Sequence, residues 1–229
     1  MKKETLKVSL TLMIYTLIAG IALALVYQFT ENRIAEAELE NVIKSMEFLL
    51  TDEDGNQIID PKEIKDSVIS KRSEMGNELY NDGIGRVISP VYEFNNGGIK
   101  YYILTASSVG YGGNVITIAA FKHDSSGIVL HKIKVIEYSQ ETPGLGAKIA
   151  EKNVQERFFP IPETGLKNGL KVDKDAGKQN IDPDTSKKEG VVKVSDVMTG
   201  ATITPRAVVN SINSMYKYLT EKYLQGGGK

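Results

Sequence analysis

The chain has 229 residues, 41% of them hydrophobic and 25% charged, which is the balance of an ordinary globular protein. Lys and Arg number 28 against 29 Asp and Glu, and this near-neutrality argues against a nucleic-acid binder, which usually carries a basic excess. The chain has no cysteine and only two histidines, which excludes thiol chemistry and cysteine-ligated clusters and leaves little for a metal site or a histidine-based triad. Any redox chemistry in this chain would therefore depend on an organic cofactor.

The N-terminal segment is apolar enough to cross a membrane. Val8 to Phe29 contains no charged residue, and about 20 apolar residues span a bilayer as a helix. Lysines precede this run and glutamates follow it, so the positive-inside rule predicts a cytoplasmic N-terminus and an extracytoplasmic C-terminal domain. The alternative is a cleaved signal peptide with its cleavage site at Ala22–Ala24. The apolar run continues past this site to Phe29, which favours an uncleaved single-pass anchor in the cell membrane.

The segment that follows has helical spacing. Glu31–Leu50 is predicted to continue the membrane helix as a stalk, because its apolar residues recur on one face: Ile34, Ala37, Val42, Met46 and Leu49. The next stretch, Thr51–Asn56, is turn-rich. It does not match an EF-hand calcium loop, because Gly55 stands at position 4 counted from Asp52, where position 6 is required.

Three segments rich in β-branched and aromatic residues predict strands of an antiparallel sheet in meander order: Ile99–Ala106, Val115–Phe121 and Ile128–Glu137. Turn-forming sequences separate them. His123 and His131 lie on or beside these strands, without a carboxylate cluster in the sequence near them, and are interpreted as structural or surface residues.

The C-terminal part alternates helices and loops. Gly146–Phe158 is predicted to be a helix with Ile149 and Phe158 buried, and Pro205–Tyr223 a helix with apolar residues at helical spacing. Thr164–Gly190 lacks periodicity and is predicted to be a surface excursion, and Val191–Val194 a short strand. The expected fold class is α+β: one transmembrane helix, then one globular domain with a mainly antiparallel sheet and flanking helices. The expected divisions are 1–30 for the cytoplasmic end and membrane helix, 31–60 for a stalk, 61–225 for the domain and 226–229 for a flexible tail.

One sequence motif runs from Asp196 to Arg206, with Thr199-Gly200-Ala201-Thr202 at its centre. Thr204 is a good helix N-cap and Pro205 suits a first helical turn, so the preceding loop should lie at a helix N-terminus, which favours an anion. The small Gly200 and Ala201 leave room beside the Thr202 hydroxyl, where a phosphate would be well placed. The alternative is a loop of small residues that only caps a helix. A tetrapeptide of the Thr199–Thr202 type occurs by chance in roughly one chain in a hundred of this length, so the motif alone does not decide between the two.

A second motif, Glu141–Ile149, lies between the third predicted strand and a helix. Its glycines can adopt positive φ and let a flat ligand approach the backbone. Glu141 and Thr142 offer hydrogen-bonding groups and Leu145 an apolar face. Gly144-x-Gly146 lacks the third glycine of a dinucleotide fingerprint, and the alternative is an ordinary glycine-rich turn.

With both motifs present, the chain resembles the FMN-binding domain family. Within that family it is similar to the G subunit of Rnf-type ion-translocating electron transport complexes and to the C subunit of the sodium-translocating NADH:quinone reductase. The resemblance covers the N-terminal anchor, the Gly110–Gly113 turn, the Glu141–Gly146 block and the Asp196–Thr202 block. Two positions depart from the family pattern: Thr199 stands where Ser is commoner, and Tyr138 where a His is expected.

The resemblance implies that a separate flavin transferase attaches FMN covalently to Thr202 through a phosphoester bond. The expected cofactor-binding residues are Thr202, Glu141, Thr142, Gly144, Leu145, Gly146, Thr199, Gly200, Ala201 and Thr204, with no metal ligand and no catalytic residue. Four tyrosines are candidates for stacking near the flavin, with ordinary packing as the alternative: Tyr101, Tyr102, Tyr111 and Tyr138. Lys148 is either a stabiliser of the reduced flavin or a solvated lysine.

The function that the resemblance implies is an electron-transfer subunit of a multi-subunit ferredoxin:NAD oxidoreductase, without independent catalysis. Its expected partners are the other membrane subunits of the complex and, during maturation, the flavin transferase. Three alternatives stay open: a subunit of the quinone reductase type, an anchored flavin relay without a pump, and an anchored binding domain without a cofactor. The coupling ion cannot be read from the sequence.

Overall fold

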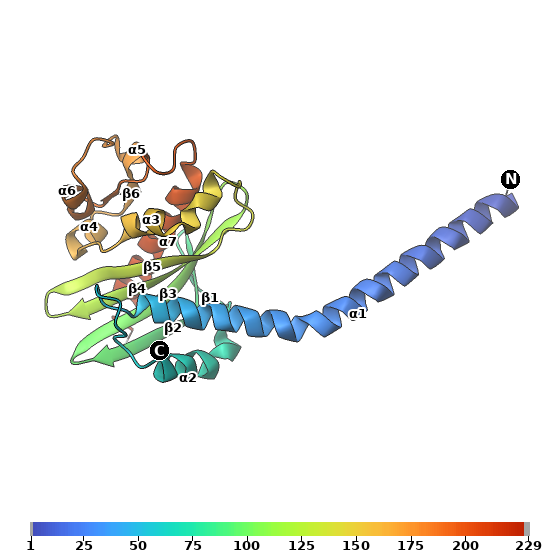
Figure 1. The fold of residues 1–229 in the computed structure, drawn as a ribbon, viewed down its shortest axis with the longest axis horizontal. Helices are drawn as coiled ribbons and strands as arrows, with labels where there is room; N and C mark the ends of the chain where they lie inside the picture. Colours follow the sequence, from blue (N-terminus) through green and yellow to red (C-terminus); the bar gives the residue numbers. More distant parts are fainter. Residues whose placement is uncertain (1, 227–229) are drawn as a thin grey trace. The chain divides into compact units, whose positions relative to one another are not determined.

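The computed structural model describes residues 2–226, so most of the predicted C-terminal tail lies outside the described residues. The chain divides into two compact units, Met1–Asn41 and Val42–Lys229. The first unit is helical, and the second contains the whole sheet (Figure 1). This arrangement confirms the α+β fold class, with a long apolar helix followed by a globular domain.

The first helix, α1, runs without interruption over Lys2–Leu49, as the continuous spacing predicts. Within residues 2–226 it is the one helix that is long and apolar enough to cross a membrane. The predicted apolar face of its second half is buried only near its C-terminal end. Met46 and Leu49 are fully buried in the second unit, whereas Ile34, in the first unit, is 51% exposed.

A five-stranded antiparallel sheet in the order β1-β2-β3-β4-β5 forms the centre of the second unit. Its strands are β1 (Glu78–Asn81), β2 (Arg86–Asn96), β3 (Ile99–Val109), β4 (Asn114–Asp124) and β5 (Gly127–Glu137). The three predicted strands are confirmed as β3, β4 and β5. β1 and β2 were not predicted. β2 contains Pro90, which cannot donate to a ladder, and its pairing register with β3 shifts between Ile88 and Tyr92.

Helices cover both faces of this sheet. On one face, α7 (Ile203–Tyr218) packs against β2, β3 and β4 and joins an apolar core that includes Tyr102 and Leu104. The alternate residues of β3, Tyr101 and Ile103, are also buried, as expected for a strand covered on both sides. The opposite face receives the end of α1: the ring nitrogen Nε2 of His131 lies 2.9 Å from the carbonyl oxygen of Thr51.

The remaining helices are short. They are α2 (Pro61–Ser70), α3 (Lys152–Gln155), α4 (Glu163–Lys167), α5 (Asp173–Ala176) and α6 (Pro183–Lys188), with 3-10 turns at Arg72–Glu74, Gly146–Ala150 and Glu156–Phe158. The prediction of one helix over Gly146–Phe158 is therefore wrong in part. Glu151 has extended backbone angles and divides the segment, although Ile149 and Phe158 are fully buried as expected.

The prediction of a surface excursion over Thr164–Gly190 is also wrong. The segment contains α4, α5, α6 and β6 (Lys171–Val172), which pairs in parallel with β7 (Val191–Val192). Its Leu166 and Val172 are buried in the main core. The side chain of Asp173 is fully buried and accepts hydrogen bonds from the hydroxyl and N–H of Ser195 at 2.5 and 3.3 Å. These hydrogen bonds attach the segment to Ser195, in the loop that precedes Thr202.

The last helix, α7, confirms the predicted apolar stripe, because its residues at helical spacing are fully buried: Val208, Ile212, Met215 and, in the π-helical turn Leu219–Tyr223 that follows, Leu219. It begins at Ile203, so Thr202 occupies the N-cap position, and the assignment of Thr204 as N-cap is wrong.

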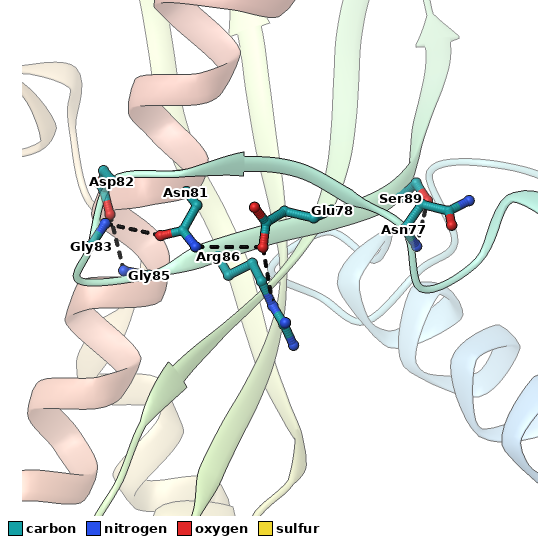
Figure 2. A network of polar contacts seen from close by, with 8 residues as sticks. All are labelled: Asn77, Glu78, Asn81, Asp82, Gly83, Gly85, Arg86 and Ser89. Carbon is teal, nitrogen blue, oxygen red and sulfur yellow. Dashed lines mark hydrogen bonds and ion pairs between the residues drawn. The ribbon is translucent and has the colours of Figure 1, made fainter.

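The turn between β1 and β2 attaches to this helix through Asp82. One carboxylate oxygen of Asp82 accepts the backbone N–H groups of Ile84 and Gly85 at 3.1 and 3.0 Å, and the Ser214 hydroxyl of α7 donates to the same carboxylate at 2.9 Å. Figure 2 shows this turn lying beside the helix, with further polar contacts along β1 and β2.

Candidate cofactor site

A cavity of about 480 Å³ lies where the Glu141–Ile149 motif meets the N-terminus of α7, and we call it the Thr202 cavity. Its volume falls in the range of small-molecule sites, roughly 300–1,000 Å³. It is lined by Tyr111, Glu141, Thr142, Leu145, Gly146, Gly200, Ala201, Thr202, Ile203 and Thr204. The fold therefore brings together eight of the ten residues expected to bind the cofactor, from two motifs that are about 60 residues apart in the sequence.

The other two expected residues do not line the cavity. Gly144 has φ of +74° in a turn closed by the Thr142 carbonyl, which accepts the N–H groups of Leu145 and Ala147 at 3.1 Å each. Its contribution is to the shape of this turn, since other residues rarely adopt such angles. Thr199 is exposed, and its hydroxyl lies 3.5 Å from the carbonyl oxygen of Ser195.

Glu141 is the most connected residue of the site. Its side chain is only 4% exposed, and its oxygen Oε1 accepts the backbone N–H groups of Tyr111 and Gly112 at 2.8 and 3.2 Å. Its other oxygen, Oε2, accepts the hydroxyl of Thr204 at 2.5 Å. The carboxylate thus joins the β3–β4 turn to the first turn of α7. Its hydrogen-bonding groups, expected from the sequence to face a ligand, are committed to the chain itself.

Glycines permit these close contacts. A Cβ atom at Gly110 would lie 2.3 Å from Oε1 of Glu141, and one at Gly146 would lie 2.3 Å from Oε2. At Gly112 a Cβ atom would lie 1.7 Å from the backbone oxygen of Gln140. These glycines have ordinary negative φ, so close packing against residues 140–141 is what requires them, not the positive φ that the sequence suggested for Gly146.

Thr202 lies at the N-terminus of α7, half-buried on the wall of the cavity. Its side chain makes no capping hydrogen bond, and within residues 2–226 its hydroxyl has no hydrogen-bond partner. The hydroxyl of Thr204, two residues later, is occupied by Glu141. Thr202 also lines a small crevice on this side of the loop, together with Asp173 and Lys174. The helix dipole at this N-terminus favours an anion at Thr202.

Arg206, the last residue of the Asp196–Arg206 motif and a cation in the first turns of α7, is already paired. Its guanidinium donates to both carboxylate oxygens of Asp175 at 2.7 Å each. The hydrogen bond from Arg206 lowers the pKa of Asp175, and the same bond raises the pKa of Arg206. This ion pair joins α5 to α7.

Exposed apolar side chains surround the cavity. Tyr111 is 72% exposed, Leu145 45% and Ile203 40%. Such large apolar groups at the edge of a cavity suit a flat, partly apolar ligand. Ile203 was not among the expected site residues, although it follows Thr202 directly in the first motif. Tyr111 was named only among four tyrosines, and no local pattern distinguishes it, because its place at the cavity follows from the approach of a distant segment.

The other candidates for stacking lie elsewhere. Tyr101 and Tyr102 are buried in the sheet, where they contact His131 and Tyr223. Tyr138 packs against the core, and Lys148 is absent from the cavity lining. Burial lowers the pKa of His131, whose ring is held against the end of α1. Within the described part of the chain, no group of three or more His, Asp and Glu side chains is arranged to hold a metal ion.

Comparisons with known proteins identify the family of the chain. The FMN-binding domain family matches residues 110–217, and the RnfG N-terminal region matches residues 1–47. The chain is 30% identical to the G subunit of an ion-translocating oxidoreductase complex from Shewanella piezotolerans, over 96% of the chain and 92% of that protein. The chain belongs to the RnfG family, the G subunits of ion-translocating oxidoreductase complexes.

Two further relatives extend this assignment. The chain is 26% identical to the G subunit of the Na(+)-translocating ferredoxin:NAD(+) oxidoreductase complex of Acetobacterium woodii, over 92% of the chain and 89% of that protein. A crystal structure described as an RnfG subunit of an electron transport complex, from Thermotoga maritima, superposes with a TM-score of 0.64 at 41% identity, covering 78% of this chain and 95% of that one. The chain is thus a G-type component of a multi-subunit oxidoreductase, with an FMN-binding domain, and other subunits of such a complex are its partners.

Proposed function

We propose that this chain carries FMN bound covalently through a phosphoester to Thr202 and relays electrons within an ion-translocating ferredoxin:NAD oxidoreductase. The observation that carries the proposal is the unpartnered Thr202 hydroxyl on the wall of a cavity of about 480 Å³, at a helix N-terminus and inside the matched FMN-binding domain. Among the three threonines of the motif, Thr204 is occupied by Glu141 and Thr199 lies outside the cavity lining.

The attachment follows from phosphate chemistry. The Thr202 oxygen attacks the FMN phosphorus of FAD within a flavin transferase, a new phosphorus–oxygen ester bond forms, and the anhydride bond breaks. AMP leaves, and the threonine proton is released. The half-buried position of Thr202 beside Gly200 and Ala201 supports this step, because small neighbours leave room for the transferase.

The remaining cavity residues orient the cofactor. The N-terminus of α7 stabilises the phosphate charge, while Leu145 and Ile203 exclude water from the flavin ring. The bound flavin supplies the electron-transfer chemistry, and the protein supplies position and electrostatic environment.

The test is to express the full chain with a flavin transferase and examine it after denaturation. We expect a fluorescent band on a denaturing gel and an intact mass raised by FMN less one water. Thr202→Ala should abolish both signals, and the matched control Thr199→Ala should keep both. Undiminished fluorescence in Thr202→Ala, or a wild-type chain without the added mass, would overturn the proposal.

We further propose that α1 anchors the chain in the cell membrane with the domain on the extracytoplasmic side, as the charge asymmetry around Val8–Phe29 favours. The cysteine-free sequence makes this testable with a single exposed cysteine, Ser73→Cys. A membrane-impermeant maleimide should label it in intact cells. Labelling only after lysis would show that the domain faces the cytoplasm and would overturn the proposed orientation.

A further inference from the structure

Tyr111 differs from the other tyrosines of the folded domain. Its ring is 72% exposed, at a cavity wall, and within residues 2–226 it makes no contact with another aromatic ring. By contrast, five tyrosines near α7 pair with aromatic neighbours at ring-centroid distances of 5.9 to 6.4 Å: Tyr80, Tyr102, Tyr216, Tyr218 and Tyr223. An exposed ring that lines a ligand-sized cavity and stacks on no other aromatic ring among the described residues is available to a flat ligand.

The backbone that carries this ring is fixed despite the exposure of the ring. The N–H groups of Tyr111 and Gly112 both donate to Oε1 of Glu141, and the Gly110 N–H donates to the Gly113 carbonyl at 2.7 Å. The turn packs so closely against residues 140–141 that a Cβ atom at Gly112 would overlap the Gln140 carbonyl. Tyr111 is therefore an exposed side chain on a preorganised backbone.

The same carboxylate also fixes the other side of the cavity. Oε2 of Glu141 accepts the Thr204 hydroxyl, two residues beyond Thr202. The distance between the Tyr111 turn and the Thr202 loop is thus set by one buried side chain that bonds to both.

We propose that Tyr111 is the aromatic residue that packs on the flavin ring in the Thr202 cavity, and that Glu141 is a positioning residue that holds Tyr111 there. This inference rests on the proposed function, because it requires a flavin on Thr202. It assigns Glu141 a role through the chain and not as a direct hydrogen-bonding partner of the cofactor.

The experiment uses the full chain carrying its flavin, in detergent, with time-resolved flavin fluorescence as the readout. A tyrosine packed on a flavin shortens the fluorescence lifetime by donating an electron to the excited ring. Tyr111→Leu should therefore lose the short-lived component, and Tyr111→Phe should also lose it, since phenylalanine is a much poorer electron donor. An unchanged lifetime in Tyr111→Leu would overturn the inference.

Glu141→Ala should lengthen the lifetime as Tyr111→Leu does, and Glu141→Gln should largely preserve the short component, because an amide oxygen can still accept both N–H groups. The double variant Tyr111→Leu/Glu141→Ala distinguishes positioning from direct contact. If Glu141 acts through Tyr111, the double variant has the lifetime of Tyr111→Leu alone. A further change in the double variant would show that Glu141 acts on the flavin independently.

A milder variant and a control variant complete the experiment. Thr204→Val removes only the hydrogen bond to α7 and should lengthen the lifetime partially, which keeps the inference testable if Glu141→Ala fails to fold. Asp82→Ala removes a similar carboxylate from the same helix, away from the cavity lining, and should leave the lifetime unchanged. Intact mass is measured for every variant: absence of flavin from the wild-type chain contradicts the proposed function, whereas flavin present with unchanged lifetimes contradicts only this inference.

Discussion

Glu141 and Asp82 attach to α7 through the same hydrogen-bonding pattern, in which one carboxylate accepts two backbone N–H groups of a turn and one hydroxyl of the helix. The two carboxylates differ in burial and in how far along the sequence their partners lie. Asp82 binds N–H groups two and three residues ahead in its own turn and is half-buried. Glu141 is 4% exposed and binds a turn about 30 residues earlier in the chain.

This difference indicates what each carboxylate does. A local turn capped by its own aspartate forms readily in many surroundings. A buried carboxylate that joins three distant segments has meaning only in the folded domain, and here those segments enclose the Thr202 cavity. If burial sets the strength of an attachment, disruption at Glu141 should cost more stability than disruption at Asp82.

The largest expected effect comes from the glycines under each carboxylate. In Gly112→Ala the new Cβ atom would meet the Gln140 backbone oxygen at 1.7 Å, whereas in Gly85→Ala it would meet the Ser214 hydroxyl at 2.5 Å. Backbone cannot move aside as a hydroxyl can, so we expect Gly112→Ala to lose about 3 kcal/mol of unfolding free energy and Gly85→Ala about 1–2 kcal/mol. Urea denaturation measures both, and equal losses would contradict the stronger constraint at Glu141.

Removal of the carboxylates comes next. Glu141→Ala leaves two N–H groups and a hydroxyl without their buried acceptor, and we expect a loss of about 2–3 kcal/mol. Asp82→Ala should cost about 1 kcal/mol, because water reaches a half-exposed turn. The same urea titrations provide the measurement. A larger loss in Asp82→Ala would reverse the comparison.

The pH dependence of stability tests the histidine on the other face of the sheet. Burial lowers the pKa of His131 below its ordinary 6.5, so the folded chain binds this proton less readily than the unfolded chain. Stability is therefore complete above about pH 6.5 and declines as the pH falls below it. His131→Gln should flatten the decline between about pH 6.5 and 5. An unchanged slope of stability against pH in His131→Gln would show that other groups cause the decline.

The smallest effect is expected at the exposed attachment of α7, the Arg206–Asp175 pair. Arg206→Gln should lose only about 0.5–1 kcal/mol, and added salt should shrink the difference. Because Arg206 lowers the pKa of Asp175, the contribution is present above about pH 3.8 and is lost as the pH falls below it. Asp175→Asn should match Arg206→Gln. If either variant lost as much unfolding free energy as Glu141→Ala, burial would not explain the ranking of these substitutions.

Much of the fold followed from local pattern. Enrichment in β-branched and aromatic residues located β3, β4 and β5, and an apolar run followed by helical spacing located α1 and, by spacing alone, the buried face of α7. The pattern failed where long-range contacts decide the structure. Pro90 obscured β2, and the polar segment Thr164–Gly190 gave no periodic signal although it packs its few apolar residues into the core.

The site likewise combines features that local sequence predicts with features that depend on long-range contacts. Eight of the ten residues selected from the two motifs line the cavity, since small residues, hydroxyls and a helix start are visible in sequence. The hydrogen bonds of Glu141 and the position of Tyr111 at the cavity, which sets it apart from the other three tyrosines, were not visible in the sequence. Glu141 has its partners in a turn about 30 residues away and in α7, and an isolated tyrosine in a glycine-rich turn looks like any surface residue.

The sequence by itself determined the chemistry open to this chain: without cysteine and with two histidines, it is confined to an organic cofactor for redox work, and its motifs point to a threonine at a helix start. Only the tertiary structure decided which threonine hydroxyl is available. Thr202 keeps a hydroxyl without a partner among the described residues, while Thr204 gives its hydroxyl to Glu141. The physical reason is that a hydrogen bond between residues 63 positions apart depends on how the sheet and α7 pack, which no local pattern specifies.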